Sequence, residues 1–451
     1  MNAEKQYIEL YEQHRELIAR CSAPVMNALR DEAFQCFRQA GFPTKKVERY
    51  RYTDVSAAFA PDYGLNLSRL QIPVNPYDVF HCDVPNLSTS LYFVVNDKFY
   101  DKVQPKAPLP EGVRIMSLCQ AAQDCPELVS KYYGTQARAR KDAINALNTM
   151  LAQDGLFVYV PRGVVVERPI QVVNILRADV DLMVNRRVLI VLEQGAQANL
   201  LFCDHAIDGR RFLTTQVAEV FVDENAHLEL YELEETHVQT NRFSNMYVCQ
   251  QAYSTAVIDS ITLQNGLSRN RTDVALCGEY GETTLYGGVI ADGQQRVDNN
   301  TLIDHRAAHC QSRELYKYVL DDQAVGAFAG RVLVREGAQK SVSQETNANL
   351  CASRQARMYT QPMLEIYADD VKCSHGSTVG QLNEAALFYM RQRGIPEDEA
   401  RLLLKFAFMG QVIDGIPMTS LRDRLHYLVE KRFRGELGKC GGCQNALNCE
   451  R

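Results

Sequence analysis

The chain has 451 residues, of which 46% are hydrophobic, and its 49 Lys and Arg residues against 55 Asp and Glu residues give a net charge of −6. This size and apolar content allow one large core with smaller additions, and the negative balance leaves no positive field for nucleic acid or an anionic membrane. No apolar run approaches the roughly 20 residues of a transmembrane helix. The N-terminal segment has no apolar stretch typical of a secretion signal, so we expect a cytoplasmic protein.

Helical spacing of apolar residues marks the start of the chain, from Lys5 to about Ala40, with Gly41 as a stop signal. Between residues 50 and 110 many Pro, Asn and Asp residues interrupt short apolar runs. A second helical stretch follows, from about Leu118 to Met150. We therefore expect residues 1–153 to form an N-terminal helical and irregular region.

From residue 154 to about residue 380, short β-branched or aromatic runs alternate with Gly, Asn and Asp, a pattern typical of strands. A similar turn recurs at Gly195, Asn225, Tyr253, Gly281, Ala308, Gly337 and Ala368. The mean step is about 29 residues, and we expect each unit to hold one turn and one alternating strand. Near-equal units let strands stack in register, which predicts a parallel β-helix over residues 154–380. A β-sandwich is the alternative, but its turns would recur every ~10 residues.

After residue 380 the apolar residues return to helical spacing. We expect one helix that closes on Gly394, a second that begins at Pro396, and a third from about Thr419 to Arg434. A stack of strands exposes an unpaired edge at each end, so helices at both ends of the chain are expected to cap it. The predicted divisions are a C-terminal helical domain over residues 381–435 and a Cys-rich tail over residues 436–451.

Cys373 and His375 form a C-x-H pair in the last predicted strand. Alternate residues of a strand point to the same face, so the thiolate and the imidazole can address one metal ion. Zinc or iron usually takes four ligands, and no further Cys or His lies at ligand spacing nearby. The pair is therefore a half-site, to be completed from elsewhere in the fold or from another chain. The alternative is a buried Cys beside a hydrogen-bonded His at a strand end.

The last residues of the chain contain Cys440, Cys443 and Cys449, a C-x-x-C motif with a third thiol. Three thiolates suit a soft metal ion or part of a cluster. Because these residues follow the last predicted helix, a mobile or redox-active tail is the alternative to a defined metal site. The other eleven of the 14 Cys residues are scattered singly, as expected for buried thiols in a reducing compartment.

Familiar catalytic motifs are missing from the sequence. The segment from Gly337 to Lys340 resembles a phosphate-binding loop but lacks the spaced leading Gly and the Gly before the Lys. No G-x-S-x-G motif occurs either. The chain alone is therefore not expected to hydrolyse ATP, and it offers no serine nucleophile in that motif.

Three segments together resemble the SufB/SufD family of iron–sulfur cluster assembly proteins, and within it the SufD branch. They are GFPTKKVERYRYTD at residues 41–54, ADDVKCSHGSTVG at residues 368–380 and LFYMRQRGIPEDEARLLLKFAF at residues 387–408. The resemblance implies a mainly β fold, a right-handed parallel β-helix flanked by N-terminal and C-terminal α-helical regions. The Cys-rich tail is not part of the family pattern, so the resemblance implies nothing for it.

The resemblance also implies a role. It implies a non-catalytic scaffold that pairs with a SufB-like paralogue, or with itself in isolation, through the end of the β-helix. The C-terminal helices would bind a SufC-like ATPase, which supplies ATP hydrolysis. His375 and Cys373 match the family residues at the interchain junction, where iron or a nascent Fe–S cluster is held transiently, and no cofactor is expected to bind the isolated chain tightly.

Other functions remain open at this point. The chain can be a SufB-like paralogue in the same pathway, or an interaction protein of purely structural purpose that is indifferent to changes at Cys373 and His375. A β-helix carbohydrate enzyme is a third hypothesis, but it would need a groove lined by acidic and aromatic residues along the stack, and the sequence contains no Trp.

Overall fold

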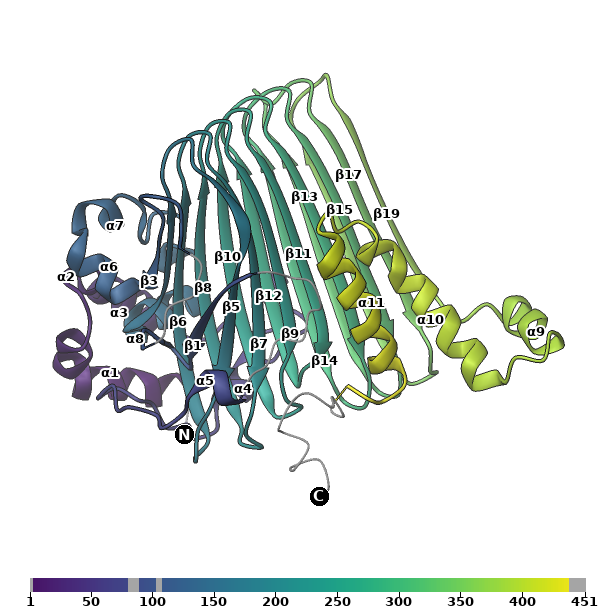
Figure 1. Ribbon diagram of the computed structural model, residues 1–451, viewed down its shortest axis with the longest axis horizontal. Coiled ribbons are helices and arrows are strands. Elements are labelled where there is room, and N and C mark those ends of the chain that lie inside the picture. Colours follow the sequence, from purple (N-terminus) through teal and green to yellow (C-terminus); the bar gives the residue numbers. More distant parts are fainter. Residues whose placement is uncertain (1–2, 80–88, 103–107, 438–451) are drawn as a thin grey trace.

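The strands wind into a parallel β-solenoid (Figure 1), in a computed structural model that describes residues 3–79, 89–102 and 108–437. Odd-numbered strands from β5 to β19 follow one another in one sheet, and even-numbered strands from β4 to β18 in the other. Each coil therefore contributes one strand to each sheet. The parallel β-helix is confirmed, but the expectation of one strand per unit was wrong: the recurring turn marks only every second strand.

The ten-stranded sheet contains β1 (Ser90–Val95), β2 (Lys98–Phe99), β5 (Val165–Leu176), β7 (Gln197–Ala206), β9 (His227–Glu235), β11 (Thr255–Gln264), β13 (Glu282–Ala291), β15 (Gln311–Leu320), β17 (Val342–Cys351) and β19 (Lys372–Gly380). The nine-stranded sheet contains β3 (Arg114–Ser117), β4 (Asp154–Val160), β6 (Leu182–Leu192), β8 (Phe212–Val222), β10 (Thr240–Gln250), β12 (Leu267–Leu276), β14 (Arg296–His305), β16 (Val325–Val334) and β18 (Arg357–Ile366). Strands β1 to β3 thus extend both sheets with residues that precede the predicted solenoid.

The turns of successive coils stack as a ladder. Asn225, Tyr253 and Tyr280 all have left-handed backbone angles, with φ between 56° and 60°. The backbone N–H of each donates to a carbonyl oxygen in the turn of the next coil, at 2.9 to 3.3 Å. The rings of Tyr253, Tyr280 and His309 stack nearly parallel, with centroids 5.0 and 4.7 Å apart. The recurring turn therefore holds the coils in register.

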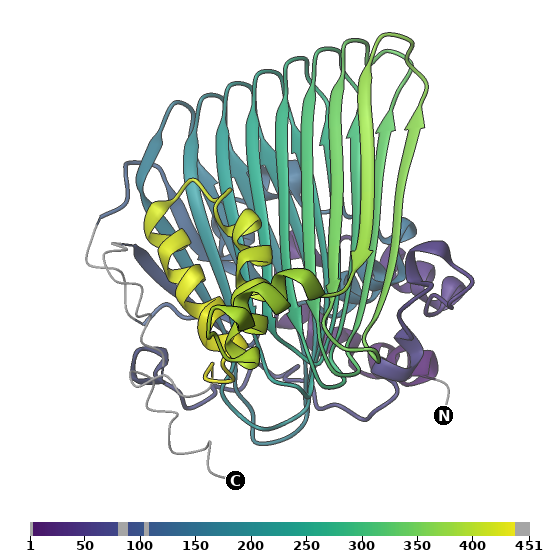
Figure 2. The same cartoon turned by 90° about the vertical axis from the view of Figure 1, so that its right-hand side faces the viewer.

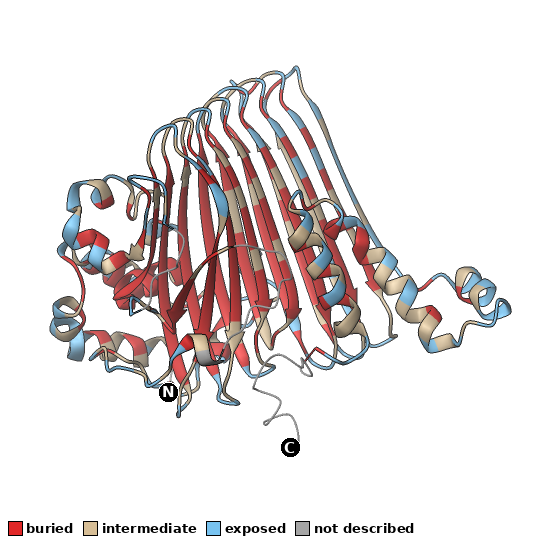
Figure 3. Cartoon of the chain, viewed as in Figure 1, coloured by how far each residue is buried: buried red, intermediate tan, exposed pale blue. Residues whose placement is uncertain are grey.

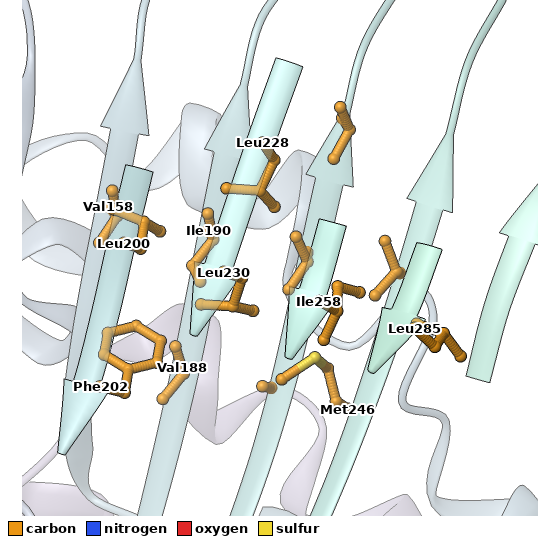
Figure 4. Packing of buried hydrophobic residues seen from close by; sticks show 14 of the residues in the cluster. Val158, Val188, Ile190, Leu200, Phe202, Leu228, Leu230, Met246, Ile258 and Leu285 are labelled. Carbon is orange, nitrogen blue, oxygen red and sulfur yellow. The ribbon is translucent and has the colours of Figure 1, made fainter. Parts of the chain in front are cut away.

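The space between the two sheets is filled by side chains and forms the largest apolar cluster of the protein. Leu200, Leu230, Ile258 and Leu285 occupy equivalent positions in consecutive coils, and each is 2% exposed or less. Figure 4 shows these four side chains among the residues that fill the interior. Burial of a column of such residues is the main driving force for winding the chain into stacked coils.

The N-terminal helices lie against the outer face of the nine-stranded sheet, at the end of the solenoid where the winding begins (Figure 1). They are α1 (Ala3–Arg20), α2 (Pro24–Asn27), α3 (Arg30–Ala40), α4 (Val55–Phe59), α6 (Leu118–Asp124), α7 (Pro126–Tyr132) and α8 (Ala143–Leu151). The short helix α5 (Pro76–Val79) lies instead on the ten-stranded sheet, where the Tyr77 ring contacts Phe93 of β1. Side chains of Asp54, Ser117 and Asp142 accept hydrogen bonds at the first turns of α4, α6 and α8.

The C-terminal helices are α9 (Glu384–Gln392), α10 (Glu397–Ile413) and α11 (Thr419–Phe433). Met409, Val412 and Leu425 pack with apolar residues of β9 to β15, on the outer face of the ten-stranded sheet. The expectation that these helices cap the end of the stack was wrong, because the apolar residues of α10 and α11 are buried against the face of the sheet. Figure 2 shows the last coil uncovered beside them. Within the described ranges, no helix is long and apolar enough to cross a membrane.

Candidate metal centre at the open end of the solenoid

Strands β18 and β19 form the open end of the solenoid. β18 pairs only with β16, and β19 pairs only with β17, so each has one edge without a strand partner in the described part of the chain. No residue of β18 or β19 is fully buried, and Figure 3 shows how burial fades toward this end. An uncovered strand edge presents a row of backbone donors and acceptors to which another chain can add.

Cys373 and His375 both lie on β19, in this last coil. Cys373 is half-buried and packs near Val334 and Ala338, whereas His375 is exposed. Two residues further along, the Ser377 hydroxyl lies 2.7 Å from the Thr360 hydroxyl of β18, on the opposite sheet. This contact places Ser377 on the inner face of the sheet. Because alternate residues of a strand share a face, the Cys373 and His375 side chains lie on the inner face as well, at the open end of the solenoid.

Two acidic residues occupy the same register position as His375 in the two preceding strands of the ten-stranded sheet. Glu345 of β17 pairs in register with His375, and Glu314 of β15 pairs with Glu345. Each glutamate is 1% exposed, and none of their four carboxyl oxygens has a hydrogen-bond partner within standard geometry. The Glu345 carboxyl group extends toward Gly330 of the opposite sheet, where a Cβ atom would lie 2.1 Å from Glu345 Oε1. Gly330 therefore provides the space that this carboxyl group occupies.

Burial shifts the protonation of these acids. It raises the pKa of Glu345 to about 9, with a further contribution from the nearby charge of Glu314. Burial also raises the pKa of Glu314 to about 7. At neutral pH Glu345 is therefore mainly a neutral acid, which explains how two carboxyl groups tolerate adjacent positions in the interior.

Below Cys373 the interior is polar as well. Cys373 pairs in register with Ser343, whose hydroxyl accepts a hydrogen bond from Ser312 at 2.7 Å. The Ser312 hydroxyl in turn lies 2.9 Å from Nε2 of His305, on the opposite sheet. Burial lowers the pKa of His305 to about 4, so its imidazole is neutral at physiological pH. Burial raises the pKa of the Cys373 thiol, so the thiol is protonated unless a cation replaces its proton.

The open end thus presents a thiol and an imidazole on one strand, with a carboxylic acid one coil below the imidazole. Within the ranges that the structure describes, no three His, Cys, Asp or Glu side chains converge closely enough to hold a metal ion. Iron bound here therefore needs ligands from outside these residues. Cys440, Cys443 and Cys449 lie outside the described residues.

Sequence reasoning missed Glu314 and Glu345. Their signal is present, because Glu314, Glu345 and His375 occupy one register position in three successive coils. Residue spacing alone hides it, because the coil length varies, and only the strand pairing shows which positions are equivalent. A search for Cys and His ligands also passes over carboxylates, although these are ordinary metal ligands.

Two family descriptions cover most of the chain. Residues 1–172 match the N-terminal region of SufBD proteins, and residues 175–408 match the SufBD core domain of SUF system FeS cluster assembly. The core-domain match contains most of the solenoid and both Cys373 and His375.

Curated relatives include proteins with the same description. An iron–sulfur cluster assembly SufBD family protein of Synechocystis is 29% identical over 406 residues, which cover 86% of this chain and 87% of that protein. The iron–sulfur cluster assembly protein SufD of Escherichia coli is 29% identical over 302 residues, covering 65% of this chain and 71% of that protein. The chloroplastic protein ABCI7 of Arabidopsis thaliana is 27% identical over 415 residues, which cover 88% of this chain and 84% of that protein.

Proposed function

The chain belongs to the SufBD family of iron–sulfur cluster assembly proteins, and from that premise we propose that it is a SufD-like scaffold subunit without turnover of its own. In this proposal its open end pairs with a SufB-like paralogue, or with a second copy when no paralogue is present. Cys373 and His375 then contribute to a junction that holds iron or a nascent Fe–S cluster as transient cargo. No cofactor stays tightly bound to the isolated chain.

The observation that carries this proposal is the position of Cys373 and His375 on the last strand of an uncovered stack. Both side chains lie at the mouth of the solenoid, and β19 has one free edge within the described chain. A second polypeptide that adds strands to this edge brings its own side chains next to the pair. An incomplete ligand set at a strand edge supports a site shared between two chains.

The C-terminal helices are the proposed binding surface for a SufC-like ATPase. Helix α9 extends away from the solenoid (Figure 1), and it exposes Phe388 and Tyr389, which are 62% and 59% accessible. Large exposed aromatic side chains on a projecting helix support contact with a partner. The cytoplasm is the proposed compartment, and the chloroplastic relative makes an organelle the alternative.

The proposal is tested by co-purifying the chain with SufB-type and SufC-type partners, followed by anaerobic iron and sulfide analysis. We expect His375→Ala to assemble normally and to lose most of the cluster, because an imidazole ligand is missing. The matched control is His14→Ala, which removes another exposed imidazole, on α1 at the far end.

Cys373→Ser is the second variant in the same experiment. Loss of cluster in both variants with intact assembly supports a shared metal site. Wild-type cluster content in both variants would instead establish the purely structural role. Failure of the wild-type chain to bind either partner would overturn the assignment as a subunit of such a complex.

A further inference from the structure

Two cysteines of neighbouring coils meet on the nine-stranded sheet, far along the solenoid from Cys373. Cys249 lies on β10, and Cys277 follows the last residue of β12, the next strand in that sheet. Their Sγ atoms are 3.5 Å apart. Gly278 contributes to this closeness, because a Cβ atom there would lie 2.0 Å from the backbone nitrogen of Ala252. The two turns can therefore approach each other only with glycine at this position.

The two thiols are electrostatically different. A hydrogen bond from the Cys249 thiol lowers the pKa of Cys277, and the positive charge of Arg306 lowers it further. A guanidinium nitrogen of Arg306 lies 3.8 Å from Cys277 Sγ, and Asp304 holds that guanidinium at 2.7 Å. The same hydrogen bond and burial raise the pKa of Cys249. The pair therefore combines a nucleophilic thiolate with a protonated neighbour.

Access to the pair is also unequal. Cys277 is half-buried, whereas Cys249 is 8% exposed. Arg306 also lines a groove of about 220 Å³, whose wall includes the cationic side chains of Lys141, Arg271 and Arg335. Asp273 and Asp304 are the acidic residues of that wall. A small reagent that carries carboxylates fits this excess of positive charge next to Cys277.

From this geometry we infer that Cys277 and Cys249 form a dithiol–disulfide redox site that reacts with an anionic low-molecular-weight disulfide of the glutathione type. The Cys277 thiolate attacks one sulfur of oxidised glutathione, forms a mixed disulfide and releases one glutathione thiolate, which takes up a proton. Cys249 then loses its proton and attacks Cys277 Sγ, and the second glutathione leaves. The two protein thiols are oxidised by two electrons, and one glutathione disulfide is reduced to two thiols.

The product requires the two sulfur atoms to move closer together. A disulfide needs them about 2.05 Å apart, against 3.5 Å here, and β10 and β12 are paired in register up to Leu276, the residue before Cys277. Oxidation therefore links two adjacent coils that stay together in either redox state. This site goes beyond the proposed scaffold role and shares no residue with it.

The test uses the reduced full-length chain, incubated with oxidised glutathione at pH 7, blocked with an alkylating agent and digested with trypsin without reduction. Cleavage after Arg and Lys places Cys249 in peptide 243–269 and Cys277 in peptide 272–296. We expect these two peptides to be recovered joined, lighter by two hydrogen atoms than their sum. Peptide 341–354 provides an internal control, because it contains the half-buried Cys351, whose pKa burial raises.

Two serine variants separate the roles. In Cys249→Ser the mixed disulfide cannot resolve, so glutathione is expected to remain on peptide 272–296; in Cys277→Ser no joined peptide forms. Arg306→Gln should shift the alkylation of Cys277 to higher pH, a readout that a merely structural role would not move. Recovery of Cys249 and Cys277 as separate alkylated peptides, or reaction of Cys277 no faster than Cys351, would overturn the inference.

Discussion

The two ends of the solenoid are built from the same repeat and end in opposite ways. Every residue of β6, near the start of the winding, is buried, whereas no residue of β19 is buried. Helices α1 to α8 cover the first coils, and the last coil carries exposed apolar side chains such as Ile366 and Val379. An uncovered apolar strand edge is a liability unless another chain covers it.

Two buried glutamates, one near each end, differ in the same way. Near the start, Arg187 and Glu219 form a buried ion pair at 2.8 Å, and Glu219 also accepts backbone hydrogen bonds from Gly134, Gln136 and Ala137. At the open end, Glu345 is buried without a partner for its carboxyl oxygens. The buried carboxyl group of Glu219 thus has its partners within the chain, whereas that of Glu345 has none in the described residues.

The largest expected effect is at the covered end. Glu219→Leu should lower the free energy of unfolding by about 3–5 kcal/mol, because it leaves the Arg187 charge buried without its partner. Urea denaturation measures the loss. The matched change at the open end is Glu365→Leu, which breaks the half-exposed pair with Arg331 and should cost less than about 1 kcal/mol. Equal losses at the two ends would contradict the comparison.

A smaller effect concerns pH and Glu345. Its pKa is raised in the folded chain from an ordinary 4.5 to about 9, so the folded state holds a proton that the unfolded state has lost between these values. This bound proton makes its full contribution to the free energy of unfolding below pH 4.5, and the contribution is lost as the pH rises toward 9. Glu345→Gln should therefore remove a pH-dependent loss on the order of 2 kcal/mol between pH 7 and 8.5.

Denaturation of the wild type and of Glu345→Gln at both pH values measures this difference. The control variant is Glu282→Gln, which neutralises an exposed carboxylate at the start of β13. A wild type and a Glu345→Gln variant with parallel pH profiles would show that this acid is ionised in the folded chain at neutral pH.

The next effect concerns pairing at the open edge. Ile366 lies on β18 and is 40% exposed. Ile366→Lys places a charge in the proposed interface and should weaken pairing by about 1–2 kcal/mol, roughly tenfold in Kd. Val238→Lys is the control, at an exposed apolar residue of a turn before β10. Sedimentation of the assembled complex distinguishes the two, and equal weakening by both variants would argue against pairing through this edge.

The smallest effect is expected from His375→Ala in the isolated chain. His375 is exposed on the last strand, so its removal should change the free energy of unfolding by less than about 0.5 kcal/mol. Thermal or urea denaturation of the isolated variant checks this. A larger loss would mean that the imidazole stabilises the fold, and a cluster defect in the complex could not then be assigned to a missing ligand.

Sequence patterns predicted the repeat and the solenoid well, because both depend on local spacing. The turn residues Asn225 and Tyr253 were recognised as equivalent, and their left-handed backbone angles and shared hydrogen-bond ladder agree with that. The number of strands per coil was not recognised, because the second turn of a coil can be as short as residues 265–266, between β11 and β12. The position of the C-terminal helices was also missed, since an apolar helical stripe shows that a helix is covered without showing by which surface.

By itself the sequence determined the alternation of turn and strand, and the placement of Cys373 and His375 on one strand face, since both follow from residues close together in the chain. Tertiary structure alone decided which end stays uncovered, that Glu345 lies beneath His375, and that Cys249 meets Cys277. The physical reason is register. Neighbours across coils depend on the length of every intervening turn, and a difference of one residue moves a side chain to the opposite face of the sheet.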